Sequence, residues 1–205
     1  MLMKCSARSL LFVCSITLLG LGGCSGLTSS DKPAMTTWWL KPYSGVATLE
    51  STPASTSLSV SVKAVPGLDT DRVLALTTDA ELKPYSAARW TENLPELTGS
   101  IISRTLTSSG HYKVLSSGDF STSDTCKLHL VLGSFFATLD STGKTDSVKV
   151  ALEGQLQCPG KETVLIGMQE TVAVQDERMK SIVAKFQQAL DAVMRQMLEQ
   201  LGKNT

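Results

Sequence analysis

The sequence predicts an α+β domain in which a mostly antiparallel β-sheet carries two main helices packed on one face. Three observations lead to this class. Short segments in which apolar and polar residues alternate recur through the middle of the chain. Two longer segments, 91–109 and 177–201, instead place apolar residues every three or four positions. Runs of strands with one helix inserted and one at the end are typical of this class.

The amino-terminal segment has the features of a targeting signal. Residues 1–9 carry Lys4 and Arg8 but no acidic residue, and an almost wholly apolar run over 10–21 follows. This run is shorter than the roughly 20 apolar residues that a membrane-spanning helix needs. We therefore expect residues 1–23 to be removed as a signal peptide, which leaves enough chain for one domain with a core.

The apolar run ends in Leu21-Gly22-Gly23-Cys24, which resembles the lipobox of bacterial lipoproteins. The glycines let the backbone enter a peptidase cleft, and the Cys24 thiol can form the thioether to diacylglycerol. Two acyl chains anchor a protein stably because each buried CH₂ contributes about 0.8 kcal/mol. We expect Cys24 to be lipidated; the alternative is an ordinary secretory signal that leaves it a plain thiol. Ser25, where inner-membrane lipoproteins carry aspartate, points to the outer membrane of a Gram-negative cell.

The rest of the chain reads as a tether and one domain. Residues 24–36 are polar, contain Pro33 and are expected to be a flexible tether, followed by a single domain over 37–205. A helix is expected over 91–109, with Pro95 tolerated in its first turn and Gly110 ending it. Strands are expected over 38–43, 57–65, 72–77, 81–85, 112–115 and 162–174, with turns at 66–69 and 79–80.

Two cysteines of the expected mature domain predict a disulfide. In an oxidising periplasm Cys126 and Cys158 form a candidate pair. Strands over 125–139 and 146–158 flank a turn, and a hairpin centred on Thr142 places the two cysteines opposite each other. The same register gives one apolar side, pairing Leu128 with Leu156, Leu132 with Leu152 and Phe136 with Val148. Two buried, unlinked thiols are the alternative.

The chain closes with a long amphipathic helix over 177–201. Asp176 is expected to cap its start, and Gly202 to stop it. A wide apolar stripe is typical of core packing, whereas a partner or lipid surface is the alternative for its flexible methionines, Met194 and Met197.

Charge and residue types exclude several functions. The chain has 19 basic and 19 acidic residues and no basic block, which argues against nucleic-acid binding. Its two histidines, His111 and His129, are expected to be solvated, and no set of residues has metal-ligand or nucleophile spacing. We therefore expect no enzyme activity, metal or cofactor.

One stretch carries a family resemblance. The segment 65–74, then Glu81-Leu82, Tyr85, Ala88-Arg89-Trp90, Leu94-Pro95 and the helix to Gly110, resembles the PqiC/YmbA family of ABC-type transport auxiliary lipoproteins. The likeness runs roughly from Trp38 to the terminal helix. It implies an outer-membrane lipoprotein facing the periplasm, without known catalytic residues. Its implied partner is an MCE-domain protein that bridges the envelope and moves phospholipid or similar lipids.

A contact surface is expected around the two tryptophan sites, with a homo-oligomer left open. Its residues are Trp38, Trp39, Leu68, Arg89 and Trp90. Trp90 either shapes this surface from beneath the turn at 66–72 or simply plugs the core. Trp38 and Trp39 alternate across a strand, so one ring should point outward. A structural or pilot lipoprotein of another envelope assembly is the main alternative function, and a lipid hydrolase is a weaker one because no catalytic set is present.

Overall fold

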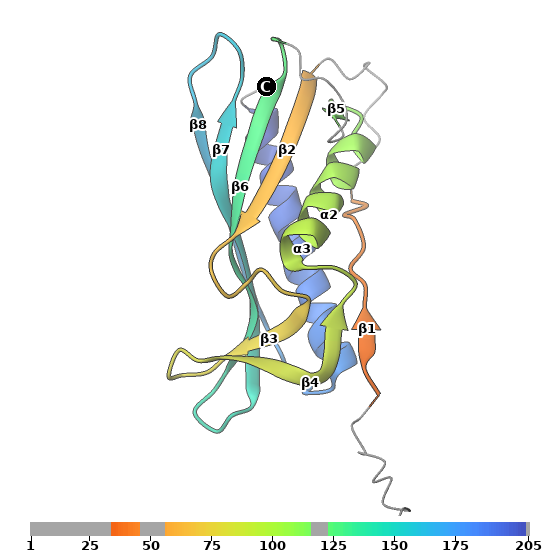
Figure 1. The fold of residues 1–205 in the computed structure, drawn as a ribbon, viewed down its shortest axis with the longest axis vertical. Helices are drawn as coiled ribbons and strands as arrows, with labels where there is room; N and C mark the ends of the chain where they lie inside the picture. The colour runs from red at the N-terminus through yellow and green to blue at the C-terminus, as the bar shows by residue number, and fades with distance from the viewer. Residues whose placement is uncertain (1–33, 46–55, 116–122, 204–205) are drawn as a thin grey trace, which may run out of the picture. The chain divides into compact units, whose positions relative to one another are not determined.

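The computed structural model describes residues 34–45, 56–115 and 123–203, all of which belong to one compact unit (Figure 1). These residues form eight strands in one mixed sheet and two helices, which confirms the α+β class. The strands are β1 (Thr36–Trp38), β2 (Thr56–Ala64), β3 (Arg72–Leu76), β4 (Leu82–Trp90), β5 (Tyr112–Leu115), β6 (Cys126–Leu139), β7 (Thr145–Gln157) and β8 (Val164–Ala173). The helices are α2 (Leu94–Ser108) and α3 (Met179–Gly202).

Strand β6 is the axis of the sheet. On one side it pairs antiparallel with β7, which pairs with β8; on the other side β2 lies along its first half and β3 near its end, both parallel to it (Figure 1). The pairs β2 with β5 and β1 with β4 are also parallel, so four of the seven pairings in the described chain are parallel. The prediction of a mostly antiparallel sheet is therefore wrong. Alternation within a strand records which face is buried and says nothing about the direction of its neighbour.

The β6–β7 hairpin confirms part of the predicted register. Leu128 lies opposite Leu156 and Leu132 opposite Leu152. Gly133 then has no partner in the ladder, and this bulge shifts the pairing by one residue. As a result Phe136 lies opposite Lys149, not Val148, and Phe135 is the aromatic residue that enters the core.

Two predicted strands differ from the observed ones in extent. The first strand was expected over 38–43, but β1 ends at Trp38 because the following backbone turns to the helices. There Lys41 exchanges two hydrogen bonds with the Gln187 side chain of α3, and the Tyr43 N–H donates to the Thr105 hydroxyl of α2. Strand β4 runs to Trp90, well beyond the expected 85, through Ala87 at a positive φ of 57°.

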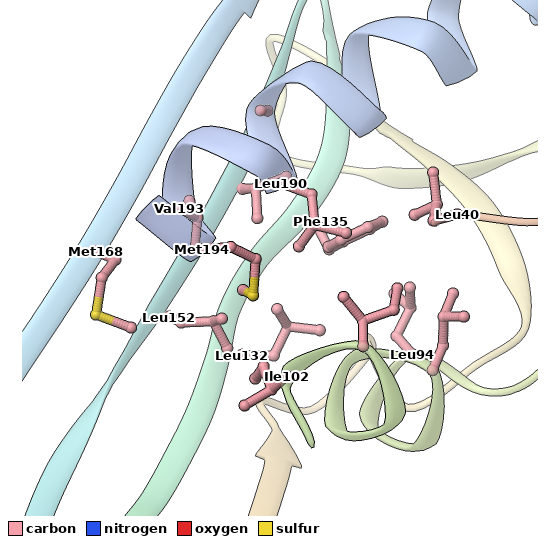
Figure 2. Packing of buried hydrophobic residues seen from close by; sticks show 14 of the residues in the cluster. Leu40, Leu94, Ile102, Leu132, Phe135, Leu152, Met168, Leu190, Val193 and Met194 are labelled. Carbon is pink, nitrogen blue, oxygen red and sulfur yellow. The ribbon is translucent and has the colours of Figure 1, made fainter. Parts of the chain in front are cut away.

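Both helices pack on the same face of the sheet. Helix α2 lies against β2 and β5, and α3 against β7 and β8. Side chains from both helices meet those of β6 and β7 in one continuous core (Figure 2). Figure 2 labels ten of its members, namely Leu40, Leu94, Ile102, Leu132, Phe135, Leu152, Met168, Leu190, Val193 and Met194. The apolar stripe of α3, Met194 and Met197 included, is therefore buried here.

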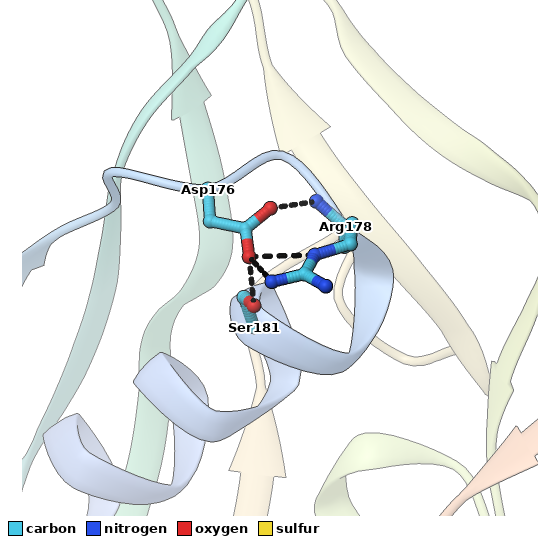
Figure 3. A network of polar contacts seen from close by, with 3 residues as sticks. All are labelled: Asp176, Arg178 and Ser181. Atoms are coloured by element: carbon cyan, nitrogen blue, oxygen red, sulfur yellow. Dashed lines mark hydrogen bonds and ion pairs between the residues drawn. The ribbon is translucent and has the colours of Figure 1, made fainter.

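The start of α3 corrects the predicted cap. Arg178, not Asp176, occupies the N-cap position, and Gly202 is the last helical residue. The Asp176 carboxylate instead accepts hydrogen bonds from the Arg178 side chain, the Ser181 hydroxyl and the Arg178 backbone N–H (Figure 3). These bonds hold the pKa of Asp176 well below its ordinary value. Neither helix of the described segments is long and apolar enough to cross a bilayer.

Candidate functional site

The predicted lipidation residue, Cys24, lies outside the described residues. The chain enters the described part at residue 34, and β1 begins at Thr36. The predicted contact residues therefore define the site that can be built, and they cluster where β1 meets the end of β4.

The pairing of β1 with β4 arranges three of the predicted side chains. The strands run parallel, with Thr37 beside Arg89 and Trp38 beside Trp90. Because side chains alternate along a strand, Thr37 and Arg89 point to one face, while Trp38 and Trp90 point to the other. Trp39 follows the last residue of β1 and has no partner in this register.

Trp90 lies in the interior. Only 1% of its surface is exposed, and its ring meets the edges or faces of Phe135 at 5.6 Å and Phe186 at 5.2 Å. Phe135 and Phe186 stack on each other at 5.1 Å, so the three rings form one cluster between sheet and α3. Leu68 is also 1% exposed. Neither Trp90 nor Leu68 can touch a partner directly, and Trp90 fills the core as the alternative interpretation proposed.

Backbone hydrogen bonds next to Trp90 hold an ion pair between Arg89 and Asp71 in position. The Trp90 N–H donates to the Asp71 carbonyl at 2.7 Å, and the Leu94 N–H donates to the Thr70 carbonyl at 3.0 Å, which fixes the turn before β3 to the start of α2. Arg89 and Asp71 form an ion pair at 3.6 Å with both side chains partly exposed. The Arg89 side chain thus reaches the surface at its Nη1 end, while its Nε atom is buried without a hydrogen-bond partner among the described residues.

Trp39 is the exposed aromatic residue of this region. It is 60% exposed, whereas Trp38 is half-buried and Leu40 is 1% exposed. Met35, which comes just before β1, is 43% exposed. The predicted contact set therefore divides into two buried residues, two half-buried ones, Trp38 and Arg89, and one exposed residue, Trp39.

The two cysteines are joined at the open end of the β6–β7 hairpin. Cys126 and Cys158 form a disulfide with their Cα atoms 4.2 Å apart, next to the paired residues Lys127 and Gln157. The predicted pairing agrees with this bond, which ties the first residue of β6 to the residue after β7. The bond stabilises the hairpin. Neither cysteine belongs to β1 or β4, the strands next to the predicted contact residues.

The face of the sheet opposite the helices is hollowed. A hollow of about 660 Å³ is lined by Ser61, Lys63, His129, Leu130, Val131, Glu153, Gly154, Gln155, Leu165 and Ile166. His129 contacts the Ser61 hydroxyl at 3.5 Å. Among the residues that the structure describes, no group of three or more His, Cys, Asp or Glu side chains could hold a metal ion.

Two features of the surface were not found by sequence reasoning. Leu165, on the edge strand β8, is 81% exposed although the alternation of β8 gave no reason to single it out. Three glutamines of α3 each bind both the N–H and the C=O of one distant backbone residue. They are Gln187, Gln196 and Gln200. Their spacing on the polar side of a helix is common to many surface helices, so no pattern in the sequence distinguishes them.

Comparison with protein families identifies the family of this chain. The model of a family described as "ABC-type transport auxiliary lipoprotein component" matches residues 40–198. None of the curated proteins is similar enough in sequence to match.

Solved structures share the fold at low sequence identity. A crystal structure described as an uncharacterized protein has a TM-score of 0.66 at 15% identity and covers 82% of this chain and 99% of its own. A Xanthomonas campestris protein of family DUF330 has a TM-score of 0.61 at 17% identity, covering 83% of this chain and 100% of its own. These likenesses concern the fold alone.

Proposed function

The chain belongs to the family of ABC-type transport auxiliary lipoprotein components, and we propose that it is a non-catalytic lipoprotein of the outer membrane in a Gram-negative cell. It acts in an intermembrane lipid transport system by docking an MCE-domain protein on the periplasmic side. The observation that carries the proposal is the family match, which runs from Leu40 to the last turns of α3 and so takes in both helices and nearly the whole sheet.

The anchor is the first part of the proposal. The lipobox-like Leu21-Gly22-Gly23-Cys24 precedes the domain by a polar segment, and a lipoprotein family is the setting in which such a motif is processed. Cys24→Ala removes the thiol that takes the diacylglycerol. We expect this variant to be soluble or held at the inner membrane, whereas the parent chain sediments with outer membranes. Outer-membrane sedimentation of Cys24→Ala, or an intact mass without acyl chains, would refute the anchor.

A docking role without catalysis is supported by what the domain offers. Trp90, one of the predicted surface residues, is buried in the core and lines no open pocket. His129 meets a serine on an open sheet face. The lipid hydrolase alternative would require esterase activity that disappears on substitution of a single Ser or His, and we expect purified protein to have none.

The partner-facing part is proposed for the two members of the predicted set that reach the surface beside the end of β4. Arg89 is partly exposed next to Asp71, and Trp39, which follows the last residue of β1, is exposed. An Arg and a Trp are the side chains that most often dominate the energetics of protein interfaces. Leu68 and Trp90 belong to the buried core, and the half-buried Trp38 packs against it.

The partner is tested by cross-linking in membranes. A photo-cross-linking residue in place of Arg89 should capture an MCE-domain protein, identified by mass spectrometry. The matched control is the same replacement at Arg195, an exposed arginine on α3. Recovery of only secretin or outer-membrane barrel subunits would favour the alternative, a structural or pilot lipoprotein. A cross-link between two copies of this chain would identify a homo-oligomer through this face.

A further inference from the structure

The sheet face opposite the helices carries two aligned rows of side chains in its hollow of about 660 Å³. Across β2, β6 and β7 the first row is Ser61, His129 and Gln155, and the second row is Lys63, Val131 and Glu153. Leu130, which lies between His129 and Val131 on β6, is buried in the core. Because side chains alternate along a strand, both rows point away from the core and into the hollow that all six residues line.

The two charges of the second row do not neutralise each other. Lys63 on β2 and Glu153 on β7 are separated by Val131 of β6, so two strand spacings of about 4.8 Å each lie between their backbones. Both side chains are exposed, and neither forms an ion pair with another of the described residues. The hollow therefore has a cationic end over β2 and an anionic end over β7.

The cationic end is suited to a phosphate group. Ser61 lies beside His129, whose Nδ1 atom is 3.5 Å from the Ser61 hydroxyl oxygen, and Lys63 is two residues further along the same strand. An ammonium, a hydroxyl and an imidazole are thus neighbours on one face, and each can donate a hydrogen bond to a phosphate oxygen. At the anionic end the Glu153 carboxylate accepts hydrogen bonds, and a primary ammonium is its natural complement.

An apolar side chain borders the same hollow. Leu165 on β8 is the partner of Gln155 and is 81% exposed. Val131, between the two charges, is half-buried. A ligand that covers these two side chains and also meets both charges has to be amphipathic. The volume of the hollow lies within the range of about 300–1,000 Å³ that is usual for small-molecule sites.

We propose that the hollow binds a phospholipid whose head carries both a phosphate and a primary ammonium, as in phosphatidylethanolamine. The phosphate lies against Lys63, Ser61 and His129. The ammonium lies against Glu153, and the first part of the acyl chains covers Leu165. The inference rests on the proposed function, which places the domain in a lipid transport system, and it names the class of lipid that the domain contacts. The surface beside the end of β4 is left to the protein partner.

The test measures binding to the full chain, purified in dodecyl maltoside, by isothermal titration calorimetry. The ligand is dihexanoyl phosphatidylethanolamine. Glycerophosphoethanolamine has the same head without acyl chains, and dihexanoyl phosphatidylglycerol has the phosphate and the acyl chains without the ammonium. We expect the first ligand to bind about fivefold more tightly than either of the others, because only this ligand satisfies both charges and the apolar border.

Variants of exposed residues assign the three parts of the ligand. Lys63→Ala and Glu153→Gln should each weaken binding of dihexanoyl phosphatidylethanolamine about fivefold, and Glu153→Gln should also remove most of the preference over the phosphatidylglycerol. Leu165→Ser should weaken binding of the acylated ligand and leave that of glycerophosphoethanolamine unchanged. The matched control is Lys127→Ala, because Lys127 is exposed on β6 two residues before His129 and is not part of the lining of the hollow. This control should bind like the parent.

Each result decides the inference. Equal affinity for the two acylated ligands, or an effect of Lys63→Ala no larger than that of Lys127→Ala, overturns it. Glycerophosphoethanolamine that binds as tightly as the acylated ligand overturns the lipid as the source of the head group.

The cross-link from position 89 is measured on the same variants, so that the two proposals are separated. Lys63→Ala and Glu153→Gln proteins that still capture the MCE-domain protein but bind the lipid weakly support the inference. A parent chain that binds the lipid as expected but captures no MCE-domain protein also supports the lipid site, and overturns the docking role alone. A parent chain that captures the partner but binds none of the three ligands overturns the inference alone.

Discussion

Gln196 of helix α3 binds both polar groups of the Gln169 backbone in strand β8, accepting from its N–H at 3.1 Å and donating to its C=O at 3.1 Å. One turn later Gln200 binds the N–H and C=O of Gly167 at 3.3 and 2.8 Å. Strand β8 pairs only with β7, so its other edge would otherwise offer unpaired groups to another chain. Two glutamines of a helix therefore take the place of a neighbouring strand.

Removing this cover should weaken the domain and open the edge. We expect the double variant Gln196→Ala, Gln200→Ala to lose about 1 kcal/mol of unfolding free energy for each glutamine, since a net hydrogen bond contributes roughly that much. Urea unfolding measures the loss, and hydrogen exchange should quicken at the amides of Gly167 and Gln169. Gln188→Ala is the control, because Gln188 is exposed on the same helix and contacts Lys185 instead of β8. Equal stability of the two variants would contradict a role in covering the edge.

Truncation of Trp90 should lower the stability of the domain far more than truncation of Trp39. Trp90→Ala removes the ring that Phe135 and Phe186 surround, and deletion of a large buried aromatic side chain costs about 3–5 kcal/mol. Trp39→Ala changes an exposed position and should stay within about 0.5 kcal/mol of the parent. Thermal or urea unfolding of both variants checks this. A stable Trp90→Ala would mean that the aromatic cluster does not support the core.

The sequence predicted the helices and strands better than it predicted which strands pair with each other. Alternation in β2 and β6 showed which side chains face the core, but β2 reaches β6 through three strands and a helix, and no local pattern encodes a parallel partner so distant. The bulge at Gly133 likewise changed the pairing of β6 with β7 in a way that the alternation did not predict. A glycine within an alternating strand allows a bulge without requiring one, so Phe136 was assigned a place that Phe135 occupies.

Which of the proposed contact residues are exposed could be predicted only in part, for a similar reason. That one of two adjacent tryptophans faces outward follows from strand geometry, and Trp39 is the exposed one. Which of them it is depends on β1 pairing with β4 and on Gln187 holding the Lys41 backbone, both contacts between distant parts of the chain. The cysteine pair was easier because a hairpin is local and its turn sets the register.

The disulfide should contribute measurably to stability. Replacing both Cys126 and Cys158 with Ser frees the open end of the hairpin, and closing a loop between residues 32 positions apart contributes about 4 kcal/mol on the chain-entropy model. Because β6 and β7 share a long ladder that can persist without the bond, we expect a loss at or below this value. Urea unfolding with and without reductant measures it. A parent protein whose unfolding midpoint ignores reductant, although reduction is complete, would contradict the prediction.

Two glycines of neighbouring strands should tolerate alanine very differently. A Cβ on Gly154 would overlap the carbonyl oxygen of His129, a backbone atom of β6 that cannot move without disturbing the ladder. A Cβ on Gly167 would meet no atom within 4 Å. We expect Gly154→Ala to cost about 1–3 kcal/mol or more, as overpacking does, and Gly167→Ala to be nearly neutral. Urea midpoints of the two variants measure the contrast, and equal midpoints would show that β6 and β7 are not so close.

Asp176 should make the stability of the domain depend on pH in the acidic range. The Arg178 side chain, the Ser181 hydroxyl and the Arg178 backbone N–H lower the pKa of its carboxyl group in the folded state. A carboxylate whose pKa is lower when folded stabilises the folded state while it is ionised. Its contribution is therefore fully present above the unfolded pKa of about 4 and is lost as pH falls toward the folded value.

The isosteric variant Asp176→Asn isolates this contribution. At neutral pH we expect it to unfold at lower urea concentration than the parent, because the amide cannot accept the Arg178 and Ser181 bonds as a charged carboxylate does (Figure 3). As pH falls below about 4 the parent loses its advantage, so the two unfolding midpoints should converge. Ser181→Ala removes one donor and leaves the charge. The stability of this variant should therefore still fall with pH, but over a narrower pH range than that of the parent. A difference between parent and Asp176→Asn that stays constant down to acidic pH would show that the start of α3 does not depend on the charge of this carboxylate.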